Sequence, residues 1–182
     1  GNAPHTMVPY ESLQDHEDKE PTEEAGKQDL AEVKYTSGTS GVLKAAVLSH
    51  GNLLSKARKH LLVPGIDIDR NTIMCHVAPV THASGGWILP VISRGGCNIL
   101  LKEFGEKTFL ETIQKEKVTH FFAVPTMLNF LMSYPDIRNY DLSSIRTIIY
   151  GASPMPPERI RQALDIFGPV LIQGYGQTET SS

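Results

Sequence analysis

Short apolar runs alternate with amphipathic segments along most of the chain, from about residue 29 onward. The apolar runs predict strands, because strands of a buried sheet are short and almost continuously hydrophobic. They lie at residues 32–35, 72–78, 97–101, 119–124, 145–150 and 170–173. The amphipathic segments predict helices at residues 50–62, 83–93, 106–117, 126–134 and 156–167. This alternation predicts an α/β fold, with a parallel sheet of about six strands and helices on both faces.

Capping and proline signals set the expected helix boundaries. Ser49 and Thr126 are expected to cap the first and fourth helices, because a hydroxyl oxygen accepts a hydrogen bond from the free N–H groups of the first turn. Pro157, which follows another proline, suits the first turn of the last helix. Pro90 is expected to interrupt or kink the second helix.

Small and polar residues gather where predicted strands end, after Tyr35, Ala78, Val124, Tyr150 and Gln173. In an open parallel sheet, ligands bind at the carboxyl ends of the strands. We therefore expect these segments to build one site, an inference that depends on the predicted fold.

The cluster at residues 36–44 combines glycines with hydroxyl residues and closes on a lysine. Its candidate phosphate contacts are Thr36, Ser37, Gly38, Thr39, Ser40, Gly41 and Lys44. Backbone N–H groups of such a loop can converge on an anion, and glycine permits their close approach. The Walker pattern is absent, because Leu43 precedes the lysine and Ala45 follows it. The alternative is a flexible Ser/Gly turn.

Two further clusters offer nucleotide contacts. Residues 151–154 are small, so a planar ligand could lie against their backbone, although a simple turn would look the same. Tyr175 lies between two glycines and could stack on a base, Thr178 could donate to a phosphate oxygen, and Glu179 could hold Mg²⁺, which prefers oxygen ligands. The alternative for the last two is a capping threonine and a surface glutamate.

The histidines differ in their sequence surroundings. His82 follows the strand at residues 72–78 and is a candidate to line a pocket, not to transfer protons. His76 and His120 fall within strands and are expected to be hydrogen-bonded core or edge residues. No G-x-S-x-G pattern is present, so a serine hydrolase has no support.

Composition and charge limit the classes of protein to which this chain can belong. The 182 residues are 40% hydrophobic and 20% charged, which is typical of a globular domain with one core. The net charge of −3 gives no support for nucleic-acid binding. Cys75 and Cys97 lack metal-ligand spacing and are expected to be buried free thiols, with a disulfide as the alternative. No apolar run is long enough to span a membrane and no signal-peptide pattern is visible, so a cytoplasmic location is expected.

Residues 1–28 differ in composition from the rest of the chain. Residues 1–28 are acidic and poor in hydrophobic residues, which predicts a loosely ordered connector or, alternatively, an interaction tail. Residues 29–182 are expected to form the α/β domain.

Taken together, these motifs resemble those of adenylate-forming enzymes, the superfamily of acyl-CoA synthetases, non-ribosomal peptide adenylation domains and luciferases. The motifs that carry the resemblance are residues 35–44, residues 49–53, the His82 cluster, residues 151–154 and residues 174–179. Residues 79–86, 124–128 and 151–157 look most like fatty-acyl or related carboxylate–CoA ligases. The resemblance implies a large domain of this fold and a two-step reaction with ATP, Mg²⁺ and, as acyl acceptor, coenzyme A.

The resemblance also implies roles for single residues. Lys44, Thr178 and Glu179 would be catalytic, Glu179 would bind Mg²⁺, and His82 would stand near the small-molecule carboxylate. The implied nucleotide contacts are the residue 36–44 loop at the β- and γ-phosphates, Gly151, Ala152 and Ser153 beside the adenine, and Gly174, Tyr175, Gly176, Gln177 and Thr178 from the adenine to the α-phosphate.

Some features depart from the family pattern. Leu43 and Ala45 replace the usual proline and glycine around the lysine, and Ser40 replaces a threonine. Family members are several times longer, and their ribose-binding aspartate, hinge and small C-terminal domain have no counterpart in this chain. We therefore expect a partial adenylation domain that is inactive alone and prone to self-association. The alternative is a nucleotide-binding or interaction module without catalysis; a P-loop kinase is disfavoured.

Overall fold

The computed structural model describes residues 24–36 and 44–180. Its strands are β1 (Leu30–Thr36), β2 (Lys44–Ser49), β3 (Ile73–His76), β4 (Cys97–Leu100), β5 (His120–Ala123), β6 (Thr147–Tyr150) and β7 (Leu171–Gln173). Its α-helices are α1 (His50–Leu61), α2 (Ile88–Ser93), α3 (Glu106–Glu116), α4 (Pro125–Ser133) and α5 (Pro157–Phe167). Short 3₁₀ helices are η2 (Ser84–Trp87), η3 (Ile137–Asn139) and η4 (Thr178–Thr180).

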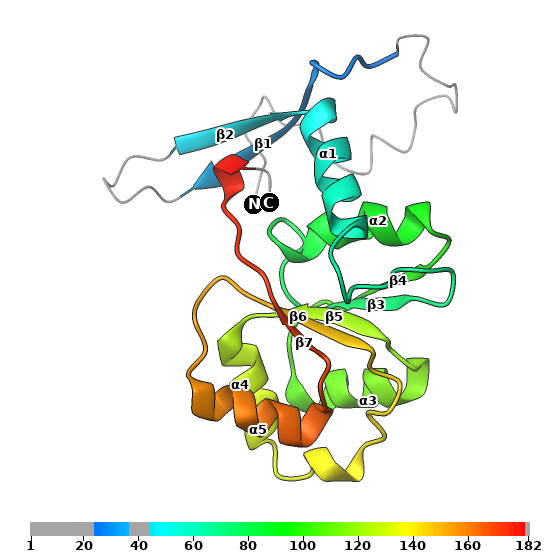
Figure 1. Ribbon diagram of the computed structural model, residues 1–182, viewed down its shortest axis with the longest axis vertical. Coiled ribbons are helices and arrows are strands. Elements are labelled where there is room, and N and C mark those ends of the chain that lie inside the picture. Colours follow the sequence, from blue (N-terminus) through cyan, green and yellow to red (C-terminus); the bar gives the residue numbers. More distant parts are fainter. Residues whose placement is uncertain (1–23, 37–43, 181–182) are drawn as a thin grey trace, which may run out of the picture.

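Five strands form a parallel sheet in the order β4-β3-β5-β6-β7. Helices α3, α4 and α5 cover one face, while α2 and α1 lie on the other side (Figure 1). The predicted α/β class, with a parallel sheet between two helical layers, is therefore confirmed.

Neighbouring residues of one strand enter two different apolar clusters. Phe121 and Ile148 belong to the larger cluster, which includes the buried faces of α3, α4 and α5. Phe122 and Ile149, the next residues along, belong to a smaller cluster with Trp87. Because successive side chains of a strand point to opposite faces, covering both faces requires apolar residues at every position. This explains the continuous apolar runs in the sequence.

The strand expected at residues 32–35 does not join this sheet. It is part of β1, which pairs antiparallel with β2, with Thr36 opposite Lys44. The prediction was wrong because residues 44–49 form an unexpected strand that pairs with β1. Only residues 37–43 separate the two strands, and a parallel crossover needs about a dozen residues, so they pair as an antiparallel hairpin. The parallel sheet consequently has five strands, and the hairpin stands apart from it beside α1 (Figure 1).

Two helix starts follow the sequence signals closely. Ser49 caps α1: its Oγ accepts a hydrogen bond from the Asn52 N–H at 3.3 Å, and Asn52 Oδ1 accepts one from the Ser49 N–H at 3.0 Å. This reciprocal pair is a capping box. Pro157 opens α5 as expected.

One expectation is corrected. Thr126 does not cap α4; Val124 is the N-cap residue, and Pro125 occupies the first turn, where its missing N–H costs nothing. The interruption expected near Pro90 is present. The second helix changes from η2 to α2 between Trp87 and Ile88, which places Pro90 in the first turn of α2.

Both cysteines are free thiols, as expected. Cys75 is buried in β3, and burial raises the pKa of its thiol to about 12. Cys97 is exposed, which corrects the expectation that it is buried, because β4 is an edge strand of the sheet.

Candidate functional site

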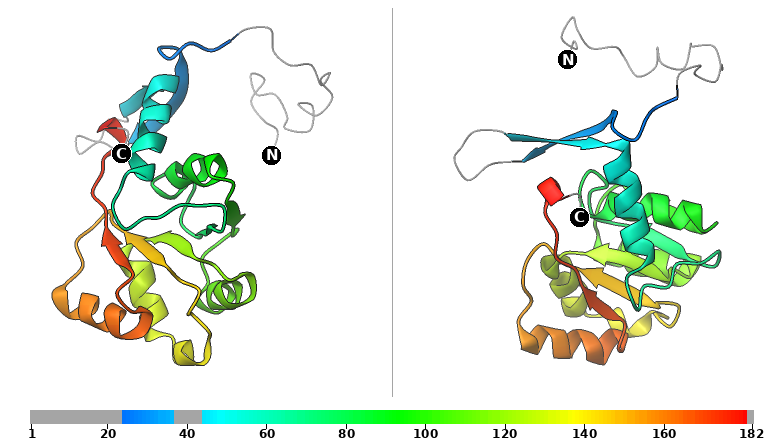
Figure 2. Two further views of the ribbon diagram at one scale, coloured as in Figure 1. Left: turned by 45° about the vertical axis from the view of Figure 1, so that its right-hand side comes forward. Right: turned by 45° about the horizontal axis from the view of Figure 1, so that its top comes forward.

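The carboxyl ends of the parallel strands meet at one edge of the sheet, below the β1–β2 hairpin (Figure 2). The chain leaves β3 for β4 on one side and then places β5 on the other side of β3. Such a reversal of strand order is where open α/β sheets bind ligands. The segments after β3, β6 and β7 border the cavities at this edge.

Three adjoining cavities occupy the space between this edge, the hairpin and α1. Cavity A, of about 170 Å³, is lined by Lys34, Leu48, Lys56, His82, Ala83, Gly176, Gln177 and Thr178. Cavity B, of about 140 Å³, is lined by Lys56, His60, Ala83, Trp87, Phe122, Ile149, Gly151, Ala152, Gly174, Tyr175 and Gly176. Cavity C, of about 320 Å³, is lined by Ala31, Glu32, Lys34, Leu53, Lys56, Ala57, Val80, Gly85, Gly86 and Leu89. Lys56 lines all three.

The segment after β6 forms one wall of cavity B. A Cβ on Gly151 would lie 2.5 Å from the Gly174 carbonyl oxygen, so glycine lets the two strand-end loops pack against each other. Ala152 has a φ of 70°, which is uncommon outside glycine. Ser153 is exposed and does not line the cavities, so the structure brings only two of the three predicted residues of this motif to them.

The segment after β7 borders both cavity A and cavity B. The Tyr175 side chain is 87% exposed, and its hydroxyl accepts a hydrogen bond from Gln177 Nε2 at 2.9 Å. Thr178 lies at the start of η4, which packs beside β2, and lines cavity A. Glu179 is exposed on the same turn and is not part of the cavity lining.

His82 is brought to the wall of cavity A that Thr178 shares, although the two residues are far apart in sequence. The segment carrying it is held from below by buried His76, whose Nδ1 lies 2.9 Å from Ser84 Oγ and whose Nε2 lies 2.7 Å from Asn98 Oδ1. Burial lowers the pKa of His76. The expectation that His76 is a hydrogen-bonded core residue is therefore confirmed.

His120 only partly fits the same expectation. It is buried in β5, and its Nδ1 lies 2.8 Å from Thr119 Oγ1. Its Nε2 has no hydrogen-bond partner within the described parts of the chain. Burial lowers the pKa of this imidazole to about 4, so the ring is neutral at pH 7.

The glycine- and hydroxyl-rich motif is only partly described. The backbone of Thr36 ends β1, and Lys44 starts β2 with an exposed side chain. Ser37, Gly38, Thr39, Ser40 and Gly41 lie outside the described residues. Their predicted contacts with phosphate stay predictions.

Sequence reasoning missed the side chains that α1 contributes. Lys56 and His60 project from one face of this helix into the cavities. His60 stacks on Trp87 with ring centroids 4.0 Å apart, and its Nδ1 lies 3.0 Å from the Gly86 carbonyl oxygen. Burial lowers the pKa of His60 to about 4. The missed signal is that Lys56 and His60 fall on the same stripe as Leu53 and Ala57, the apolar side of the helix.

The donors at this edge fit a metal ion that arrives with a nucleotide. Within residues 24–36 and 44–180, no three His, Cys, Asp or Glu side chains are grouped to hold a metal. Glu179 offers one carboxylate near Thr178 and cavity A. Mg²⁺ typically takes one or two protein carboxylates together with substrate phosphates and water, so a single carboxylate suits that mode of binding.

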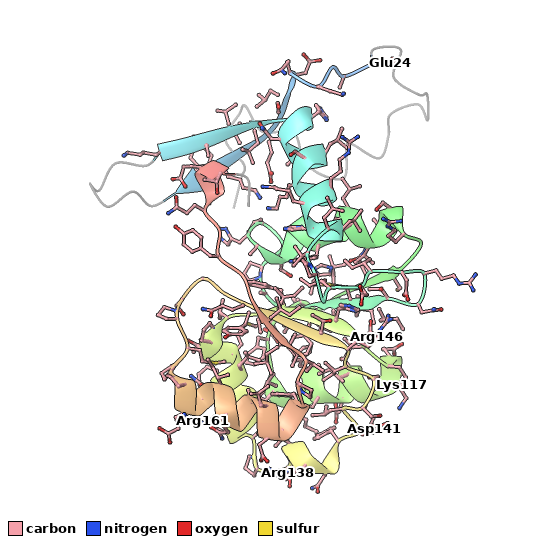
Figure 3. The ribbon with its side chains drawn as sticks, in the orientation of Figure 1. Glu24, Lys117, Arg138, Asp141, Arg146 and Arg161 are labelled. Carbon is pink, nitrogen blue, oxygen red and sulfur yellow. The ribbon has the colours of Figure 1, made fainter. Side chains whose placement is uncertain are left out.

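A short surface ion pair lies away from the cavities. Lys117 Nζ is 2.7 Å from Asp141 Oδ2, on the helical side of the sheet opposite the hairpin (Figure 3). Lys117 and the Ser143 hydroxyl hold the pKa of Asp141 well below its usual range.

None of the helices in the described part of the chain is both long and apolar enough to cross a membrane.

Comparisons with known proteins agree with this geometry. A model of the family "AMP-binding enzyme" matches residues 2–182. A feruloyl-CoA synthase of Amycolatopsis is 35% identical over 176 residues, which are 96% of this chain and 35% of that protein. A medium/long-chain fatty-acid–CoA ligase of Mycobacterium tuberculosis is 33% identical over 145 residues, covering 80% of this chain and 25% of that protein.

A solved structure shows the same fold. The N-terminal domain of FACL13 from Mycobacterium tuberculosis superposes with a TM-score of 0.83 and 28% identity, covering 94% of this chain and 42% of that one. The chain thus spans between a quarter and about a third of the length of these two curated relatives. It belongs to the AMP-binding, adenylate-forming enzyme family, in which its relatives are acyl-CoA ligases.

Proposed function

We propose that the protein carrying this chain activates a small carboxylate with ATP as an acyl-adenylate and transfers the acyl group to the thiol of coenzyme A. The observation that carries the proposal is cavity A. It brings Thr178 and His82 together at the reversal of strand order, with Lys34 beside them. A negatively charged phosphate and a carboxylate would both be attracted to such a cavity.

The proposed chemistry balances in two steps. A carboxylate oxygen attacks the α-phosphorus, and the bond to the β-phosphate breaks to release pyrophosphate. The thiolate sulfur then attacks the acyl carbon, and AMP leaves with the oxygen that came from the carboxylate. Mg²⁺, when bound, neutralises charge on the phosphates during the first step.

The chain's own residues would position the reactants. The Thr178 hydroxyl donates to an α-phosphate oxygen, Glu179 holds the magnesium ion, and Lys44 neutralises the outer phosphates. The adenine lies against residues 151–153 and Tyr175 outside cavity B, on the side where Ala152, Ser153 and Tyr175 are exposed. His82 borders the carboxylate in cavity A. Catalysis by this arrangement is mainly orientation and charge stabilisation.

The direct test is carboxylate-dependent ATP–pyrophosphate exchange in a full-length ligase that contains this chain. Glu179→Gln is expected to slow the exchange by roughly 10²-fold or more, because a charge that stabilises the transition state is lost. Glu158→Gln, at an exposed glutamate in α5, is the matched control and should leave exchange unchanged. An unchanged rate for Glu179→Gln would remove the magnesium role.

A nucleotide-binding module without catalysis is the second candidate, because the chain covers only part of its relatives' length. ATP that binds the 182-residue chain in calorimetry, with no pyrophosphate formed by the full-length protein, would favour it. Formation of ADP instead of AMP would revive the kinase alternative. A cytoplasmic location, the acidic connector at residues 1–28 and self-association stay predictions.

A further inference from the structure

Lys56 is a buried cation without a partner. Its side chain is only 7% exposed, and within the described ranges no hydrogen bond or ion pair reaches its ammonium group. Glu32, the acidic residue that lines cavity C, forms its ion pair with Lys34 instead, at 3.2 Å. Lysine is almost never fully buried unless it is paired, so this position calls for an anion.

The Lys56 ammonium occupies space that any side chain at residue 86 would fill, and residue 86 is a glycine. A Cβ at residue 86 would lie 2.9 Å from Lys56 Nζ and 2.5 Å from its Cε. Gly86 lines cavity C and does not line cavity A, where Thr178 and His82 lie. The Lys56 ammonium therefore lies beside Gly86 at the wall of cavity C, although the side chain also lines cavities A and B.

The charges around Lys56 favour an incoming anion. Burial contributes most to lowering its pKa, Lys34 and Lys59 lower it further, and Glu32 alone raises it. His60, one turn along the same helix face, is neutral at pH 7 because its pKa is lowered to about 4. A carboxylate beside Lys56 would remove the unfavourable burial of a lone charge.

Cavity B limits the body of the substrate. Its floor is apolar, formed by Trp87, Phe122 and Ile149, and its volume of about 140 Å³ resembles that of a cavity which holds one benzene ring, about 150 Å³. Lys56 and His60 close the same cavity on the side of α1. A flat ring fills this space, whereas a long unbranched acyl chain would have to continue into an adjoining cavity.

We infer that the substrate is a compact, ring-sized carboxylic acid with a second acidic group, and that Lys56 binds this second group. The inference rests on the proposed function. The carboxylate that reacts lies in cavity A, the ring lies on the apolar floor of cavity B, and the second acid meets the Lys56 ammonium beside Gly86. A fatty acid, expected from the sequence resemblance, would leave Lys56 unpaired.

The test compares carboxylates by kcat/KM for pyrophosphate release in the full-length ligase. The probes are benzoate, decanoate and the three benzenedicarboxylates, which place the second acid at different angles. At least one dicarboxylate is expected to exceed benzoate and decanoate by about 10-fold or more, the size of a hydrogen bond to a charged group. Lys56→Met should lower this dicarboxylate by about 10- to 100-fold and leave benzoate nearly unchanged.

Three further variants make the test specific. Lys56→Arg keeps the charge and should retain the preference, while Gly86→Ala should disturb it by displacing the ammonium. Lys59→Met, on an exposed face of α1, is the matched control. Melting curves by circular dichroism check folding; methionine fills a similar volume, so Lys56→Met is expected to fold.

Each outcome decides between the two proposals. Equal activity toward monoacids and diacids in the wild type would overturn the inference and leave the proposed function standing. An equal fall for every carboxylate in Lys56→Met would also overturn it, because Lys56 would then serve the reacting end. If no carboxylate releases pyrophosphate, the proposed function fails and the inference fails with it.

Discussion

Thr178 and His82 are candidate site residues because both lie in segments that follow strands of the parallel sheet. Both were predictable, because each follows an apolar strand in a polar, glycine-containing segment, and the parallel sheet then places such segments together. Lys56 and His60 were not predictable as site residues. Lysine on a helix is normally solvated, and only the packing of α1 against Gly86 and Trp87 reveals that this face is buried.

Buried neutral histidines make stability depend on pH. The pKa of His60 is about 4 in the folded protein and near 6.5 in an unfolded chain, so between these values the unfolded state binds more protons and stability rises with pH. The free energy of unfolding is expected to fall by about 2 kcal/mol per such histidine between pH 7 and pH 5. Asp141, whose pKa is lowered, loses its contribution only at more acidic pH.

Urea denaturation of wild type and His60→Phe at pH 7 and pH 5 measures this effect. Phenylalanine keeps a ring beside Trp87 but cannot be protonated. The variant should lose less stability between the two pH values than the wild type. An identical loss in both proteins would mean that His60 is not held neutral by the fold.

At the scale of elements, apolar patterning and prolines predicted the parallel strands and most helices within a few residues. The β1–β2 hairpin was the main miss, because the run at residues 45–48 is short and follows a loop that resembles a helix-leading phosphate site. Pairing between strands is a tertiary property, and a single short run does not reveal its partner. The hairpin matters because it forms the upper wall of cavities A and C.

The capping box of α1 gives a prediction at this scale. Ser49→Ala removes the hydroxyl that accepts from Asn52, and it should destabilise the protein by about 1 kcal/mol. Ser55→Ala, at an exposed position inside the same helix, is the matched control and should be neutral or slightly stabilising. Urea denaturation measures both. Equal effects from the two substitutions would show that the capping box contributes nothing.

At the scale of the whole molecule, the parallel sheet decides where a ligand site can form. The sheet is buried on both faces, so its polar strand-end segments gather at its carboxyl edge. At this edge they meet the hairpin and α1 (Figure 2). The sequence motifs identified this edge, but its cavities and their buried lysine required the three-dimensional arrangement.

The central claim is that a carboxylate attacks the α-phosphorus of ATP, and isotope transfer tests it most directly. The full-length ligase would be supplied with ATP, coenzyme A and a substrate labelled with ¹⁸O in its carboxylate, and the AMP would be analysed by mass spectrometry. Because AMP leaves with an oxygen from the carboxylate, the proposed reaction predicts one ¹⁸O atom in each AMP formed. Unlabelled AMP, or label recovered in inorganic phosphate, would contradict it.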